Sequence, residues 1–112
     1  MFLCLAGLIR YYLSMKIAVP RDKIADFCRR NHIHRLAFFG SVLRADFSPE
    51  SDVDVLVEFE PGSRVGMIGL AGMEIELSRL LDRRAELHTV NGLSPHYRDN
   101  VLQTAEVGYE RT

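Results

Sequence analysis

The most constraining feature of the sequence is the stretch DVDVLVEF at residues 52–59, in which polar and apolar side chains alternate. Side chains of a β-strand point alternately to its two faces, so this pattern predicts a strand with one apolar face. The side chains expected in a core are Val53, Val55, Val57 and Phe59. Asp52 and Asp54 would share the opposite face, and charged residues are rarely buried without a partner. That second face therefore needs a separate explanation.

Two carboxylates at positions i and i+2 of a strand have Cα atoms about 6 to 7 Å apart. Asp52 and Asp54 would repel each other unless a cation lies between them or one of them takes up a proton. Oxygen ligands on a rigid strand beside a phosphate site are typical of Mg²⁺ that also binds a nucleoside triphosphate. This pair of aspartates therefore predicts a metal site.

A candidate phosphate site precedes the aspartates. The apolar run at residues 35–39 has the length of a strand and ends at Gly40 and Ser41, and residues 42–46 can form a short helix. Glycine allows close backbone approach, and the N–H groups at a helix start can bind phosphate oxygens together with the serine hydroxyl. Each feature alone is common in turns. Their order, with ten residues between Ser41 and Asp52, makes a more specific signature.

The rest of the chain alternates helical and strand patterns. Residues 19–31 and 65–81 carry apolar side chains at helical spacing, and residues 84–90 alternate as a strand does. Residues 95–110 have the pattern of a final amphipathic helix. No repeat and no long linker divides the chain, so we expect one small α/β domain.

Composition restricts the function classes. With 112 residues, 47% hydrophobic residues and a formal net charge of −1, the chain has the make-up of one small globular domain. It lacks the broad basic surface of proteins that bind nucleic acid through many phosphate contacts. The spacing of Cys4 and Cys28 argues against a zinc site or a disulfide framework, so a reducing cytoplasm is the default expectation.

Residues 1–14, MFLCLAGLIRYYLS, form an apolar segment that is too short to span a bilayer and lacks the features of a signal peptide. Met15 offers a plausible alternative start. We therefore expect residues 15–112 to form the domain and residues 1–14 to be an extension outside the fold. A hydrophobic arm that binds a partner is the alternative.

The stretch FGSVLRADFSPESDVDVLVEF resembles the active-site motif of the DNA polymerase β-like nucleotidyltransferase superfamily. It is most similar to that of the minimal nucleotidyltransferase (MNT) proteins of prokaryotes, and the resemblance covers about residues 16–112. The fold that this resemblance implies is an α/β (α+β) domain with a small mixed central sheet and helices packed on one face.

Taken residue by residue, the resemblance implies that Gly40 and Ser41 bind the terminal phosphates of a nucleotide. Arg44 fills the place of an arginine that is common in the family after the Gly-Ser pair. Asp52 and Asp54 correspond to the aspartate pair that holds Mg²⁺.

In this family a third carboxylate, usually an aspartate on a later strand, completes the site, and Glu86 stands on that strand here. By alternation, Glu86 shares a strand face with Arg84 and His88. We expect Glu86 to be catalytic, either holding a second Mg²⁺ or accepting the proton of the attacking hydroxyl. A solvated residue paired with Arg84 is the alternative. For His88, contact with a phosphate or substrate and a plain surface position both remain open.

The function implied by the resemblance is transfer of AMP from ATP to an acceptor, with release of pyrophosphate. Small MNT proteins are similar to antitoxins encoded beside HEPN-domain toxins, and these antitoxins add AMP to a tyrosine of the toxin. We therefore expect a HEPN-domain toxin as the partner. Two alternatives remain: a nucleotidyltransferase for small molecules whose site is completed by dimerisation, and an inactive antitoxin that neutralises its toxin by binding.

Overall fold

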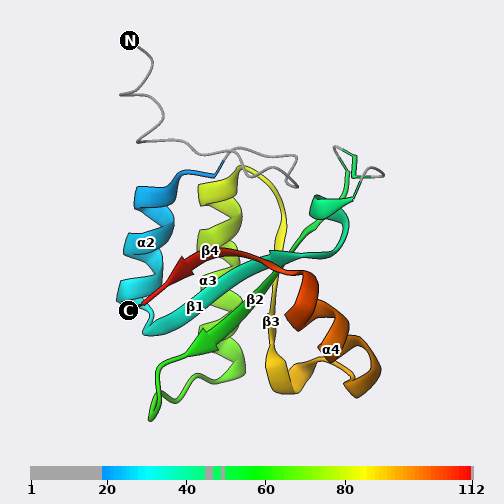
Figure 1. Ribbon diagram of the computed structural model, residues 1–112. Helices are drawn as coiled ribbons and strands as arrows, with labels where there is room; N and C mark the ends of the chain where they lie inside the picture. The colour runs from blue at the N-terminus through cyan, green and yellow to red at the C-terminus, as the bar shows by residue number, and fades with distance from the viewer. Residues whose placement is uncertain (1–18, 45–46, 49, 112) are drawn as a thin grey trace.

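A four-stranded mixed sheet forms the centre of the part of the chain that the computed structural model describes, residues 19–44, 47–48 and 50–111 (Figure 1). Its strands are β1 (Ile33–Phe39), β2 (Val53–Phe59), β3 (Ala85–Thr89) and β4 (Glu106–Glu110). The strand order is β3-β2-β1-β4. β1 pairs antiparallel with both β2 and β4, whereas β2 and β3 run parallel. The expected mixed central sheet is confirmed.

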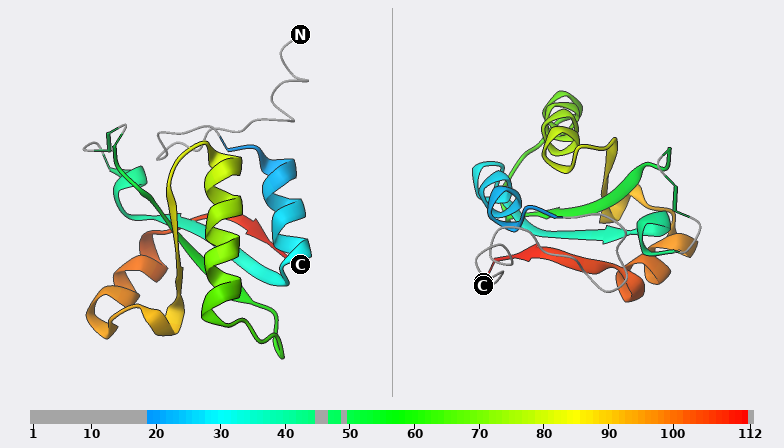
Figure 2. Two further views of the ribbon diagram at one scale, coloured as in Figure 1. Left: turned by 180° about the vertical axis from the view of Figure 1, so that it is seen from behind. Right: turned by 90° about the horizontal axis from the view of Figure 1, so that it is seen from above.

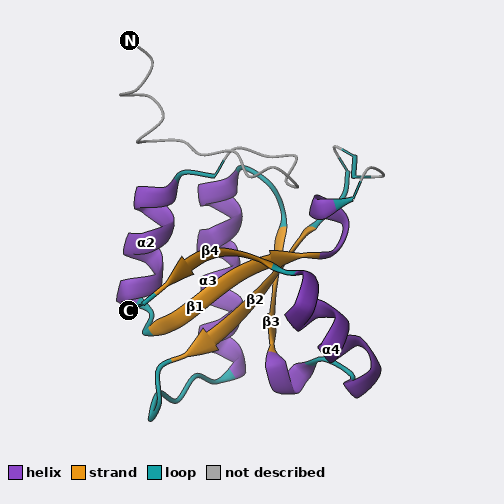
Figure 3. Ribbon diagram, in the orientation of Figure 1, coloured by secondary structure: helices purple, strands orange, loops and turns teal. Residues whose placement is uncertain are grey.

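Helices lie on both faces of this sheet (Figures 2 and 3). The α-helices of the described residues are α2 (Arg21–Arg30), α3 (Met67–Leu81) and α4 (Pro95–Thr104). Two short 3₁₀ helices, η1 (Gly40–Leu43) and η2 (Val90–Gly92), connect elements. α2 and α3 cover one face, as expected, and α4 packs at one end of the other face (Figure 2). None of these helices is long and apolar enough to cross a lipid bilayer.

The two faces of β2 contribute to different clusters. Its three valines are buried in the main core, together with side chains from α2 and α3. The α2 residues predicted to share an apolar face, Ile24, Phe27 and Cys28, are all buried there. Leu56 points the other way and packs with Phe39, Leu93 and Val101 in a smaller cluster under α4. The alternation read from the sequence therefore describes β2 correctly on both faces.

The final helix is shorter than its sequence pattern predicts. The prediction of a helix over residues 95–110 is wrong at its end, because α4 stops at Thr104 and residues 106–110 form β4. β4 completes the open side of β1, and Gly108 makes this approach possible. A Cβ atom at Gly108 would lie 2.6 Å from the ring of Phe38, so only glycine fits without a shift.

α3 buries fewer of its apolar side chains than expected. Leu77 and Leu81 are buried in the main core, but Ile68 is 90% exposed and Ile75 is 56% exposed. The helical spacing of apolar residues therefore predicted the helix but not its buried side, because apolar residues occupy more than one side of α3. The predictions for residues 1–14 concern a segment outside the described residues.

Candidate active site

Parallel pairing of β2 and β3 places Asp54 beside Glu86. The two residues are direct partners in the register, and Leu56 is paired with His88 two residues further on. Side chains at these positions lie on the face that carries α4. One donor atom from each of Asp54, Glu86 and His88 lies within 4.8 Å of the other two. Two strands of the central sheet thus bring three potential metal ligands together on a rigid framework.

Asp52 lies at the edge of this cluster. It immediately precedes β2, and its Oδ2 atom is 3.4 Å from Nε of Arg84. The same arginine reaches toward Glu86, with 4.0 Å between Nη2 and Oε2. Because Arg84 is largely exposed, these are solvent-screened ion pairs that need little energy to open. Arg84 therefore links the carboxylates of Asp52 and Glu86.

Like charges dominate the electrostatics of the cluster. Burial raises the pKa of Glu86, and the negative charges of Asp54 and Asp52 raise it further. A hydrogen bond with Asp54 raises the pKa of His88, because the carboxylate stabilises the protonated ring. Negative charge gathered in the cluster contributes to both shifts, after burial in the case of Glu86. A bound cation would relieve this repulsion.

The turn after β1 lies against the Asp54 carboxylate and the Asp52 backbone. Gly40 has a φ angle of 78°, in the left-handed region that favours glycine. A Cβ atom there would lie 2.7 Å from Oδ2 of Asp54, so glycine also leaves the space that this carboxylate needs. Ser41 donates a hydrogen bond of 3.4 Å from Oγ to the carbonyl oxygen of Asp52. The helix predicted at residues 42–46 is, in its described part, the 3₁₀ turn η1, which starts at Gly40 and ends at Leu43, and residues 45–46 lie outside the described residues.

Comparison with known proteins agrees with this geometry. Residues 21–107 match the nucleotidyltransferase domain family. A protein of Methanocaldococcus jannaschii that is named as a protein adenylyltransferase is 30% identical over 91 residues, which span 81% of this chain and 96% of that protein. The chain belongs to the nucleotidyltransferase domain family. Its fold is therefore that of a nucleotidyltransferase.

Three solved structures share the fold of this nucleotidyltransferase. A toxin-antitoxin complex with AMP-PNP matches with a TM-score of 0.68 and 19% identity, covering 84% of this chain and 76% of that chain. A complex of a tri-AMPylated HEPN toxin of Shewanella oneidensis with its MNT antitoxin matches with a TM-score of 0.60 and 19% identity. In the latter case 81% of this chain and 70% of that chain are covered. A third structure, described as that of a minimal nucleotidyltransferase, matches with a TM-score of 0.62 and 33% identity over 78% of this chain and 85% of that chain, which confirms the minimal nucleotidyltransferase fold.

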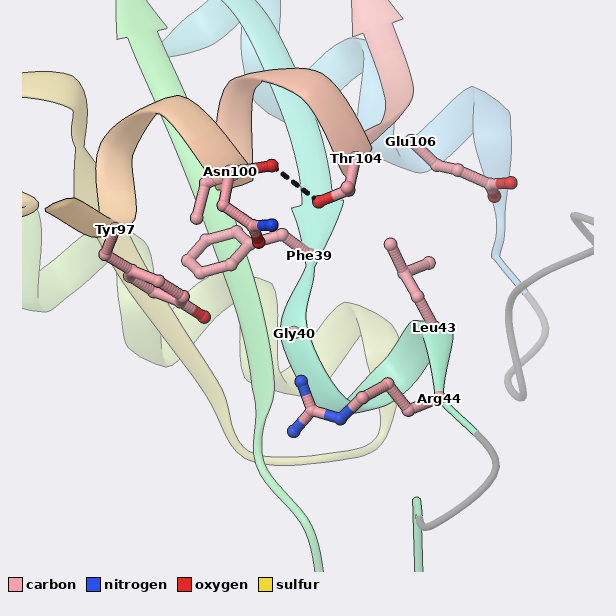
Figure 4. Close-up of a pocket in the computed structure, with 9 residues that line it drawn as sticks. Phe39, Gly40, Leu43, Arg44, Tyr97, Asn100, Thr104 and Glu106 are labelled. Atoms are coloured by element: carbon pink, nitrogen blue, oxygen red, sulfur yellow. Dashed lines mark hydrogen bonds between the residues drawn. The ribbon is translucent and has the colours of Figure 1, made fainter.

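A cavity of about 380 Å³ opens beside the Gly40 turn of the nucleotidyltransferase (Figure 4). The Arg44 side chain reaches under Gly40 from η1, and Tyr97 and Asn100 face the same space from α4 (Figure 4). The ring of Tyr97 meets that of Phe39 edge to face, with 6.1 Å between centroids. The cavity thus offers a cation, an amide and an aromatic ring, and Gly40 lies between it and the Asp54 carboxylate.

Most predicted site residues therefore meet at one end of the sheet. Gly40 and Asp54 are in contact, Glu86 is beside Asp54, and Arg44 lines the adjoining cavity. Glu58, which shares the strand face of Asp54, pairs instead with Arg35 at a distance of 3.0 Å. It takes no part in the cluster.

Sequence reasoning missed the contribution of α4. Tyr97 and Asn100 are three residues apart and so lie on one side of the helix, which is a usable signal only once the position of α4 is known. The sequence also did not decide whether His88 lies within hydrogen-bonding distance of Asp54, as it does in the structure. It follows from the parallel register of β2 and β3, which alternation within one strand does not define.

Proposed function

We propose that this nucleotidyltransferase transfers AMP from ATP to a HEPN-domain toxin and acts as its antitoxin in the cytoplasm. The observation that carries the proposal is the contact between the Gly40 turn and Asp54, with Glu86 paired beside it. The adenylyltransferase name of a relative that covers 81% of the chain supports AMP as the transferred group. The HEPN toxin and MNT antitoxin of Shewanella oneidensis supply the parallel for the partner.

The donor set suits Mg²⁺. Asp54 and Glu86 present carboxylate oxygens within 4.8 Å of each other, and hard oxygen ligands are those that Mg²⁺ prefers. Asp52 would join them by exchanging its exposed ion pair with Arg84 for the metal. With Mg²⁺ held by these residues, charge on the triphosphate would be neutralised and the α-phosphate would be more electrophilic. These three carboxylates are our proposed metal ligands.

The Gly40 turn would position the phosphates. Gly40 lacks a side chain at the point where the backbone meets Asp54, so a phosphate can approach the backbone closely. The Ser41 hydroxyl makes a long hydrogen bond to the Asp52 carbonyl, which it can exchange for a phosphate oxygen. Arg44 lines the adjoining cavity and would balance phosphate charge.

The transfer step follows from this arrangement. A hydroxyl of the toxin attacks the α-phosphorus, a new O–P bond forms, and the bond from the α-phosphorus to the bridging oxygen breaks. Pyrophosphate leaves on the side of Gly40 and Ser41. Glu86, which lies beside Asp54 on the far side from the Gly40 turn, would either hold a second Mg²⁺ or take the hydroxyl proton.

The test is incubation of the chain with its HEPN partner, ATP and Mg²⁺, followed by mass spectrometry of the partner. We expect the partner to gain AMP, and Asp54→Asn to lower the rate of transfer by about 100-fold or more, because it removes a ligand charge. Glu58→Gln is the matched control, since Glu58 lies on the same strand face but pairs with Arg35 away from the site.

The control variant should transfer AMP at the parental rate. Neutralisation of the toxin by a parent protein that adds no AMP would overturn the proposal in favour of an antitoxin that works by binding. Transfer of AMP to a small molecule, with none to the partner, would overturn the choice of acceptor.

A further inference from the structure

His88 shares the metal cluster with two carboxylates but differs from them in its donor atom. Its Nε2 atom is 3.3 Å from Oδ1 of Asp54, and one donor atom of Glu86 lies within 4.8 Å of both residues. Mg²⁺ binds its ligands at about 2.1 Å, which puts adjacent ligands of an octahedron about 3 Å apart. The separation of the Asp54 and His88 donor atoms is therefore close to that of two ligands on one ion.

The imidazole ring is held in this orientation by the fold. His88 lies on β3 opposite Leu56, and its ring meets the ring of Phe39 edge to face, with 5.3 Å between centroids. Phe39 is buried, so it provides a fixed surface. The His88 side chain itself is 32% exposed, which leaves it accessible to an ion from solvent. A ligand held on a strand and packed against a buried ring loses little freedom on binding.

Nitrogen changes which metals a site prefers. Imidazole is a good ligand for first-row transition ions, whereas Mg²⁺ favours oxygen ligands and keeps its water. A site built from Asp54 and Glu86 alone would suit Mg²⁺. The addition of His88 gives two oxygens and one nitrogen on one side of an ion, a donor set suited to a divalent transition metal.

We propose that His88 is a metal ligand and that it makes this site bind a divalent transition ion, with Mn²⁺ as the probe, more tightly than Mg²⁺. The inference rests on the proposed function for the place of the metal. It goes beyond that function because it assigns the metal preference to one residue. Asp54 and Glu86 supply the other two ligands of this cluster, Asp52 remains the further ligand of the proposed function, and Phe39 fixes the ring of His88.

The alternative is that His88 serves only packing, as an aromatic residue against Phe39. His88→Phe separates the two roles, because phenylalanine keeps the ring contact and removes the nitrogen. His88→Asp is the reciprocal variant, which makes all three ligands carboxylates. His34→Phe is the matched control, since His34 lies at the other end of β1 from Gly40.

The experiment uses the full chain without nucleotide. Electron paramagnetic resonance measures free Mn²⁺ during a titration, and competition with Mg²⁺ gives the ratio of the two affinities. We expect the parent to prefer Mn²⁺ by about 10-fold or more, and His88→Phe to lose about 10-fold or more in Mn²⁺ affinity, since even groups that only orient metal ligands contribute 10- to 100-fold. His88→Asp should shift the ratio toward Mg²⁺, and His34→Phe should leave it unchanged.

An unchanged affinity ratio in His88→Phe would overturn the inference, as would a parent protein that shows no preference for Mn²⁺. A ratio that falls equally in His34→Phe would show that the histidines bind Mn²⁺ non-specifically, which also overturns it. In all of these cases AMP transfer with Mg²⁺ would leave the proposed function standing. Conversely, a strong Mn²⁺ preference without any AMP transfer would separate the metal site from the proposed reaction.

Discussion

Phe38 and Phe39 are neighbours in β1 that serve opposite faces of the sheet. Phe38 belongs to the main core between the sheet and α2 and α3. Phe39 belongs to the small cluster under α4, where it also contacts the rings of His88 and Tyr97. Both side chains are almost fully buried. Equal burial on the two faces therefore has different consequences, because only one face borders the candidate site.

The main core is closed, whereas the α4 face is only partly covered. Among the described residues, the buried set contains no polar or charged side chain. On the α4 side, four buried residues form the cluster, and the end of the sheet beyond them carries Asp54, Glu86 and His88 in partly exposed positions. This division lets one sheet combine an apolar core with a charged site, since charged groups that stay in contact with water avoid most of the desolvation cost.

The largest loss of stability should come from a substitution in the main core. We expect Phe38→Ala to lower the free energy of unfolding by about 3 to 5 kcal/mol, as large-to-small changes of buried aromatics do. Phe39→Ala should lower the free energy of unfolding by less. Phe39 already borders the open cavity beside Gly40, so its removal enlarges that cavity and leaves no new enclosed void. Urea unfolding of both variants measures the difference. A loss in Phe39→Ala as large as that in Phe38→Ala would show that the two faces are equally closed.

A medium loss of stability is expected at the Gly40 turn, which follows β1. Gly40→Ala should lower the free energy of unfolding by about 1 to 3 kcal/mol and weaken nucleotide binding, because it combines a positive φ with a Cβ atom 2.7 Å from Oδ2 of Asp54. Gly62→Ala is the matched control, since Gly62 has a φ of 86° but nothing within 4 Å of the added atom. Thermal unfolding and ATP titration would compare the two variants.

Gly62→Ala should lower the free energy of unfolding only through the strain of its positive φ angle, and it should retain nucleotide binding. If the two variants lose equal stability and both bind ATP as the parent does, the contact between Gly40 and Asp54 has no role in the site. If Gly40→Ala loses more stability than Gly62→Ala and a second change, Asp54→Ala, restores it, the added Cβ atom clashes with the Asp54 carboxylate.

The parts of this fold that follow local patterns could be predicted from the sequence. The alternation in β2 and the apolar face of α2 depend on residues within a few positions of one another. β4 was missed because its partner β1 lies about 70 residues away in the chain, and Gly108, which looks like a weak strand former, is required by contact with Phe38. Pairing over such distances leaves little trace in a local pattern.

The same limit applied to the candidate site. Gly40 and Asp54 could be connected by their order in the chain, which resembles a known motif. The position of His88 beside Asp54 depends on the parallel register of two strands, and that of Tyr97 depends on α4 packing against the sheet end. These are tertiary contacts, so the sequence left the role of His88 open and did not point to Tyr97.

The smallest effect on stability is expected at an exposed position of α3, the helix that covers one face of the sheet together with α2. Ile68 is 90% exposed, and Leu77, on the same helix, is fully buried in the main core. Ile68→Ala should change the free energy of unfolding by no more than about 0.5 kcal/mol, as exposed substitutions usually do, while Leu77→Ala should cost about 2 to 5 kcal/mol. Because both changes place alanine in the same helix, their helix propensities nearly cancel and burial decides the difference. Urea unfolding of the pair measures it. A loss in Ile68→Ala close to that of Leu77→Ala would mean that Ile68 is covered in the folded protein, and that apolar positions on α3 stabilise the chain from more than one side.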